Sequence, residues 1–127
     1  MKLFGREYGM LYSVGAQQEI AELCPENDLT KLSEALGGKA FERTEKAARI
    51  PMILSSWHER AESVMAKEEG REYKPSPITW DLIALLSVEE FSALLTEAFK
   101  VMARDSGRSV EADAGEKKTE AAGSSLS

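Results

Sequence analysis

His58 is the only histidine of the 127-residue chain, and its side chain could support catalysis or metal binding. The segment from His58 to Arg60 begins like the helical motif of zinc proteases, but the chain has no second histidine to complete a zinc site. Glu62 follows four residues later and would lie on the same helical face. We therefore predict a surface pair between His58 and Glu62 rather than a metal site or an acid–base couple.

The candidate nucleophiles lack the surroundings that would activate them. No serine lies in a recognisable nucleophile elbow or beside a base, so a Ser-His-Asp triad is not predicted. Cys24 lies at the end of a predicted helix, on its apolar side, without the cationic neighbours that make a thiol reactive. We expect a buried thiol at Cys24, and we expect that the protein is not an enzyme.

Two further patterns could bind ligands but have simpler structural explanations. The run at residues 37–39 suggests a phosphate loop, but the Walker pattern needs a glycine where this chain has Ser33, so we interpret the glycines as a helix end. The carboxylates of Glu68, Glu69 and Glu72 lie close together in the sequence and could attract a cation. They lack the ligand spacing and the glycine turn of a calcium loop. We expect no cofactor and no metal.

Trp57 and Trp80 are the two tryptophans, and tryptophan is typical of contact hot spots between proteins. Each lies in an apolar stripe with helical spacing. That pattern favours packing in the core for both side chains.

The composition limits the class of partner. Hydrophobic residues make up 43% of the chain and charged residues 30%, with a formal net charge of −6. An acidic chain is a poor nonspecific binder of nucleic acid, and no apolar run approaches the ~20 residues of a membrane span. Arg6 and Glu7 interrupt any signal-peptide core, and one cysteine cannot form an internal disulfide. We expect an intracellular protein that binds neither nucleic acid nor membrane.

The elements that would position these residues begin with a β-hairpin over residues 2–13. Gly5-Arg6 suits a two-residue type II′ turn, and Tyr8, Met10 and Tyr12 alternate onto one face of a following strand, Glu7–Tyr12. Helical patterns fill residues 14–105. The first expected helix is capped by Ser13 and ends near Cys24, and the second is capped by Asn27 or Asp28 and ends at Gly37-Gly38. A helical region follows over 39–67, in which Pro51 either kinks the helix or starts a new one. Thr79 then caps a short helix, and the last helix begins at a Ser87–Glu90 capping box and ends near Asp105.

The predicted fold class is therefore α+β and mostly α, with a short N-terminal β-hairpin packed on a bundle of about five helices. Residues 1–105 form one domain, and residues 106–127 are expected to be a disordered tail because they contain no aromatic and few large apolar residues. In the last helix the expected inner stripe is Val88, Phe91, Leu94, Leu95, Ala98 and Met102.

Two segments carry a resemblance to a known family. They are FGREYGMLYSVGAQQEIAEL, at residues 4–23, and PITWDLIALLSVEEFSALLTEAFKVMA, at residues 77–103. In the order of its elements and in these residues, the chain resembles the tail assembly chaperones of long-tailed bacteriophages and prophages over most of residues 3–104. Residues 77–79 match the proline-x-threonine helix cap of that family, whereas Gly37-Gly38 and Pro51 have no assigned counterpart in it.

The resemblance implies a function in virion assembly. Such chaperones bind the long tape-measure protein in the cytoplasm of the bacterial host and are absent from the mature virion. The expected partner of this chain is therefore a tape-measure protein, with the tail tube protein as a further candidate. An exposed hairpin edge could contact the partner or a second copy of the chain, which makes Tyr8, Met10, Leu11 and Tyr12 the candidate contact residues. A helical adaptor or regulatory protein-binding module of a phage or bacterium is the alternative function.

The resemblance also raises a question about the end of the chain. Many genes of that family make a longer product through a programmed ribosomal frameshift near the end of the shorter reading frame. Glu116, Lys117 and Lys118 can be encoded by a slippery run of adenines. A solvated charge cluster in a disordered tail is the other explanation for these three residues.

Overall fold

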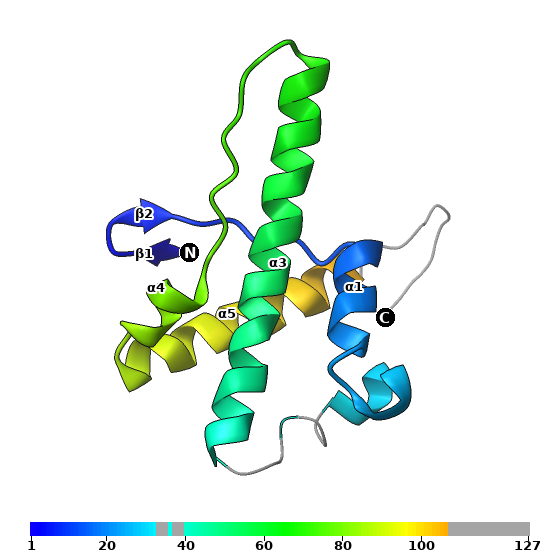
Figure 1. The fold of residues 1–127 in the computed structure, drawn as a ribbon, viewed down its shortest axis with the longest axis vertical. Coiled ribbons are helices and arrows are strands. Elements are labelled where there is room, and N and C mark those ends of the chain that lie inside the picture. Colours follow the sequence, from blue (N-terminus) through cyan, green and yellow to red (C-terminus); the bar gives the residue numbers. More distant parts are fainter. Residues whose placement is uncertain (33–35, 37–39, 107–127) are drawn as a thin grey trace.

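The computed structural model describes residues 1–32, 36 and 40–106, and within them it confirms a mostly helical protein with a small two-stranded antiparallel sheet (Figure 1). The described residues contain four α-helices rather than about five, and the difference falls on the predicted second helix, of which residues 33–35 and 37–39 lie outside the described residues. The predicted tail lies outside the described residues, except for Ser106, which is the last residue of α5. The elements are β1 (Lys2–Leu3), β2 (Arg6–Glu7), α1 (Val14–Ala21), the 3-10 turns η1 (Pro25–Asn27) and η2 (Leu29–Lys31), α3 (Ala40–Glu68), α4 (Trp80–Ala84) and α5 (Val88–Ser106).

The difference in helix count lies in residues 25–36. Asp28 accepts hydrogen bonds from the backbone N–H and the hydroxyl of Thr30, at 3.0 and 2.7 Å, so it does cap a helical segment. That segment begins as the 3-10 turn η2 and continues at Leu32, which is helical and whose carbonyl accepts the Leu36 N–H at 3.1 Å. Residues 33–35 and 37–39 of the predicted helix lie outside the described residues. Helix α1 also ends earlier than predicted, because the N–H groups of Leu23 and Cys24 bond three residues back and tighten the chain before Pro25.

The predicted helix caps are confirmed at three positions. The hydroxyl of Ser13 accepts the Ala16 N–H at the start of α1. Thr79 caps α4 in the same way. Ser87 and Glu90 exchange two hydrogen bonds, of 2.8 and 3.1 Å, which form the predicted capping box at the start of α5.

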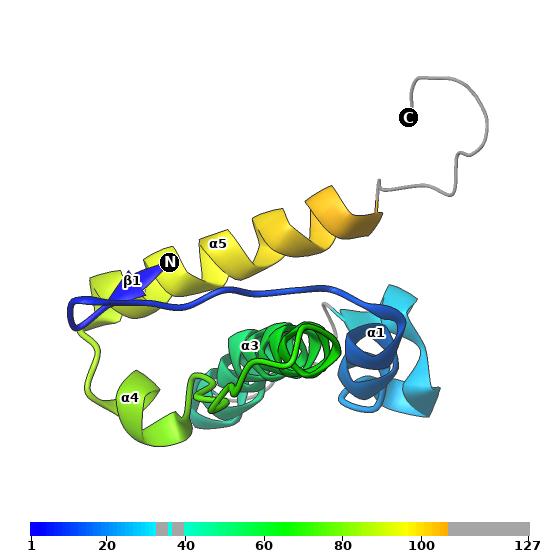
Figure 2. The same ribbon diagram turned by 90° about the horizontal axis from the view of Figure 1, so that it is seen from above.

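Helix α3 is the centre of the fold, and the chain between β2 and α1 separates it from α5. Seen from above, the chain between β2 and α1 runs between α5 and α3, while α1 and α4 lie on opposite sides of α3 (Figure 2). Hydrogen bonds confirm this layering, because the Leu11 N–H bonds to the Leu54 carbonyl of α3, at 3.0 Å, and the Tyr12 N–H bonds to Asp105 of α5. The buried core residues are Leu3, Tyr8, Met10, Ala16, Ile20, Ala48, Ile50, Leu54, Ile78, Ile83, Leu94, Ala98 and Val101.

The hairpin is present, but its turn and its second strand differ from the prediction. Lys2 pairs with Glu7 and Leu3 with Arg6, so the central turn residues are Phe4 and Gly5. Both have positive φ angles, 51° and 80°, as a type I′ turn requires, and the predicted type II′ turn at Gly5-Arg6 was therefore wrong by one residue. Beyond Glu7, Tyr8 still exchanges two hydrogen bonds with Met1, at 2.7 and 2.8 Å. The predicted strand does not continue to Tyr12, because the Leu11 N–H bonds to α3 and the Tyr12 N–H to Asp105 of α5.

Helix α3 continues through Pro51, so Pro51 does not start a new helix. Its far end has a stop signal that was not predicted. Gly70 has a φ of 73°, its N–H bonds to the Lys67 carbonyl, and the Arg71 N–H bonds to the Ala66 carbonyl at 2.7 Å. These two bonds form a Schellman motif, which reverses the chain toward α4.

Helix α5 is rotated about its axis relative to the prediction. Its buried residues are Leu94, Ala98, Val101 and Asp105, whereas Val88, which was expected in the inner stripe, is 87% exposed. The rotation directs the Asp105 carboxylate toward the chain between β2 and α1. Leu95, also expected inside, is only half-buried.

Candidate protein-binding surface

His58, the candidate catalytic or metal-binding residue, makes structural contacts in the fold. His58 Nε2 lies 4.0 Å from Glu62 Oε2, which confirms the predicted pair, and the imidazole packs over the backbone of Gly9. Among the described residues, no cluster of three or more histidine, cysteine or acidic side chains could hold a metal ion.

Cys24 is buried, as predicted. Its Sγ donates a hydrogen bond to the Ile20 carbonyl, at 3.6 Å. Burial raises the pKa of the thiol, and the nearby charge of Asp28 raises it further. A raised pKa leaves little thiolate at neutral pH, so this side chain behaves as part of the core.

Two buried polar residues of α3 hold the segment that returns from Gly70 to α4, and the sequence analysis did not identify either one. Ser55 Oγ accepts the Ile78 N–H at 2.8 Å. Glu59 Oε1 accepts both the Tyr73 hydroxyl and the Ser76 N–H, each at 2.8 Å. These side chains lie four residues apart on one face of α3, which also carries Glu62, so their spacing alone does not distinguish them from a solvated polar face.

Asp105 has a similar role at the end of α5. Its carboxylate accepts the Tyr12 N–H at 2.9 Å and pairs with the Arg104 guanidinium, at 2.8 Å between Oδ1 and Nε. The hydrogen bond with Asp105 is the largest factor that raises the pKa of Arg104. Asp105 therefore joins α5 to the chain that enters α1.

The four residues predicted to contact a partner are placed in two groups. Tyr8 and Met10 are 6% and 7% exposed and belong to the core, so a partner can reach little of their side chains in this conformation. Leu11 and Tyr12 are half-buried. A partner contact at these residues stays a prediction, and in this conformation only Leu11 and Tyr12 offer it appreciable surface.

The two tryptophans have different environments. Trp57 is half-buried, with its indole against the Gly15 backbone on one side and the Arg60 guanidinium 4.2 Å from the ring centroid. Trp80 is 45% exposed, so the prediction of core packing was wrong for it. Helix α4 is only five residues long, and Ile83 is its buried residue.

A cleft of about 700 Å³ lies in front of Trp80. It is formed by the end of α1, the first half of α3 and the start of α4. Its apolar lining is Leu23, Met52 and Trp80, and its charged rim is Glu22, Glu45, Lys46 and Arg49. An apolar floor with charges of both signs at the rim suits the apolar face of an amphipathic peptide.

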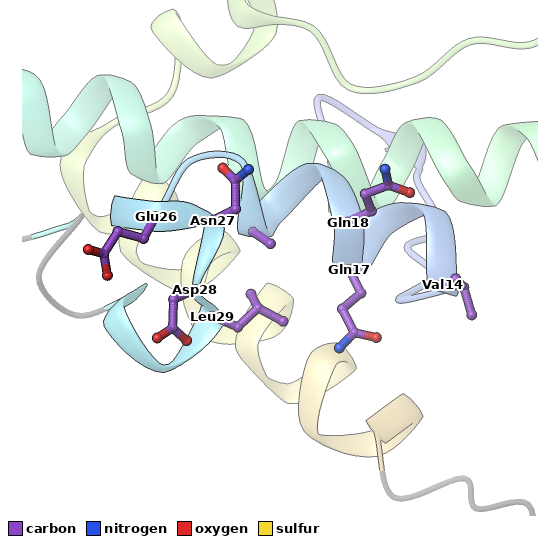
Figure 3. A pocket seen from close by; sticks show the side chains of 8 residues that line it. Val14, Gln17, Gln18, Glu26, Asn27, Asp28 and Leu29 are labelled. Carbon is purple, nitrogen blue, oxygen red and sulfur yellow. The ribbon is translucent and has the colours of Figure 1, made fainter.

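A second recess, of about 620 Å³, lies beside α1. Figure 3 shows Gln17 and Leu29 pointing to one side of it and the carboxylate of Glu26 pointing away. Its lining is Val14, Gln17, Gln18, Ala21, Glu26, Asn27, Asp28 and Leu29. Because its charged groups do not converge, it is a weaker candidate than the Trp80 cleft.

Comparisons with protein-family models, with curated proteins and with solved structures found no match to this chain. In the part of the chain that the structure describes, no helix combines the length and the apolar character that a membrane crossing needs.

Proposed function

We propose that this protein is a tail assembly chaperone, which binds the tape-measure protein in the host cytoplasm and is not retained in the mature virion. The Trp80 cleft is the observation that carries the proposal. A tape-measure chain has long helical segments with apolar faces, which must stay soluble until the tail tube covers them. The cleft would cover one such face in the helix-in-groove mode.

The lining of the cleft has the composition of an interaction site. Tryptophan and arginine are the residue types enriched at energetic hot spots, and Trp80 and Arg49 both line the cleft. An exposed indole beside Met52 and Leu23 offers a large apolar area, and methionine adapts its shape to different partners. The rim charges would orient a helix by pairing with its polar flanks.

The sequence resemblance supplies the identity of the partner. It comes from residues 4–23 and 77–103, and the second of these segments contains Trp80 itself. The tail tube protein is a second candidate partner on the same grounds. The resemblance also supports a longer, frameshifted product, which would be found as peptides that continue beyond Lys118 into another reading frame.

A helical adaptor with a different partner would use the same cleft. It is distinguished by a one-to-one complex with a protein other than a tape measure. The cleft geometry is compatible with both functions.

Binding to a tape-measure fragment of the same phage or prophage tests the proposal directly. We expect co-expression to keep the fragment soluble, and we expect calorimetry with the purified proteins to show micromolar affinity. Trp80→Ala and Met52→Asp should weaken binding, whereas Phe4→Ala, which removes an exposed aromatic ring from the hairpin turn, should not. Absence of binding at high micromolar concentrations would overturn the proposal. Loss of binding with Leu11→Lys but not with Trp80→Ala would place the contact on the chain that follows the hairpin.

A further inference from the structure

Helix α5 has a second apolar stripe beside the buried one. The buried stripe is Leu94, Ala98 and Val101, which face the core. The second stripe, which we call the outer seam, is Val88, Ser92, Leu95, Phe99 and Met102. Val88 is 87% exposed and Phe99 is 39% exposed, so the described residues leave an accessible apolar surface on this side of α5, and Leu85, in the turn before α5, is 72% exposed beside it.

The spacing of the outer seam is that of a coiled coil. Its members are separated by four, three, four and three residues, which is the a/d alternation that keeps apolar side chains on the contact line between two helices. Only Ser92 is polar. With 19 residues, α5 is about 28 Å long, enough for a seam of about two heptads.

We propose that the outer seam is the interface for a second copy of this chain, with the two α5 helices antiparallel. In an antiparallel coiled coil, residues at heptad position a of one helix lie opposite residues at position d of the other. Pairing centred between Ala93 and Leu94 then gives two kinds of layer within the helices, each occurring twice: Val88 with Phe99, and Ser92 with Leu95. It also brings Met102 level with the turn that carries Leu85. The seam is thus self-complementary in size, because the largest side chain, Phe99, faces the smaller Val88.

The charges of α5 also suit a copy of the same helix in the opposite direction. Glu89 and Glu90 lie in its first turn, and Lys100 and Arg104 lie near its end. Antiparallel pairing brings the acidic end of one helix beside the basic end of the other, whereas parallel pairing would bring like charges together. Antiparallel helix dipoles favour the same direction. Net acidity of −6 per chain opposes association, so we expect dimerisation to strengthen with added salt.

The oligomeric state of the full chain tests this interface. We expect sedimentation equilibrium to show a dimer at micromolar concentrations, and Phe99→Glu to weaken dimerisation by about tenfold or more. Ala93→Glu is the matched control, because it adds the same charge to an exposed position of α5 away from both stripes. Thermal denaturation of both variants shows whether the fold is intact. A monomeric wild-type protein, or an equal effect of the two variants, would overturn the proposal.

Charge exchange tests the direction of the pair. Glu89→Lys and Lys100→Glu should each weaken the homodimer, and an equimolar mixture of the two variants should restore a dimer, because each variant then carries the charges that its partner lacks. If neither single change weakens the dimer, the antiparallel pairing is wrong. Trp80→Ala should leave dimerisation unchanged, which separates this interface from the proposed tape-measure cleft. If the wild type is monomeric and Phe99→Glu loses tape-measure binding, the outer seam binds the tape-measure protein instead of a second copy, and the proposal is overturned.

Discussion

The indole of Trp57 lies directly on the backbone of Gly15, so that the centre of α3 and the first turn of α1 approach without an intervening side chain. A Cβ at Gly15 would come closer than 3.0 Å to three atoms of the ring. The Arg60 guanidinium lies 4.2 Å from the centroid of the same indole. This contact fixes the position of α1 against α3.

Gly15→Ala should therefore destabilise the protein although alanine favours helices. The propensity gain of about 1 kcal/mol is outweighed by the overlap with the indole, and we expect a net loss of about 1–2 kcal/mol in the free energy of unfolding. Chemical denaturation followed by circular dichroism measures this change. In a Trp57→Leu background the same substitution should cost less, and an equal cost in both backgrounds would contradict the contact.

Asp105→Ala should also destabilise the protein, because the Tyr12 N–H would lose its acceptor in a partly buried position. We expect a loss of about 1–3 kcal/mol, which is typical of an unsatisfied buried donor. Asp105→Asn keeps an acceptor oxygen and loses only an ion pair with the exposed Arg104, so its cost should be smaller. If the two variants have the same stability, the hydrogen bond to Tyr12 contributes little.

Local signals in the sequence predicted local structure. The caps at Ser13, Thr79 and Ser87 were found because each depends on residues within three positions. The rotation of α5 was not predicted, because it is coupled to a hydrogen bond between Asp105 and Tyr12, which lie 93 residues apart.

The candidate site was harder to predict for the same reason. The cleft brings Leu23, Met52 and Trp80 together from three segments, and none of the three differs in sequence pattern from a core residue. Exposure of Trp80 follows from the shortness of α4, which offers little surface for burial. The pairing of His58 with Glu62 was predictable because it lies within one turn of one helix.

Alkaline titration should report the contact between Tyr73 and Glu59. The hydrogen bond to Glu59 is the main cause that raises the pKa of Tyr73 above the ordinary tyrosine value, and burial adds to it. Because the folded pKa lies above the unfolded one, this contact contributes its full stability below the ordinary tyrosine pKa and loses it as the pH rises through the raised pKa.

Nuclear magnetic resonance of the Tyr73 ring carbons in the wild type and in Glu59→Gln measures this effect. The variant lacks the nearby negative charge, so we expect the pKa of Tyr73 to fall toward its ordinary value and the alkaline loss of stability from this group to be smaller and to be complete at lower pH. Tyr12 is the internal control, because burial raises its pKa without any contribution from Glu59. An unchanged Tyr73 titration would show that Glu59 does not hold the hydroxyl in solution.

Gly70, which ends α3, should not tolerate a side chain without a loss of stability. Its φ of 73° costs an L-residue about 1–2 kcal/mol, although the space around its Cα is open. Gly70→Ala should therefore lower the free energy of unfolding by about 1 kcal/mol, and Gly70→Asn should cost less, because asparagine tolerates this conformation better. Lys67→Ala, an exposed change one turn earlier in α3, is the control and should be nearly neutral.

Because no atom lies within 4 Å of a Cβ built at Gly70, a clash cannot explain a loss at this position. Equal stability of Gly70→Ala and the wild type in chemical denaturation would show that α3 does not end in a left-handed turn in solution.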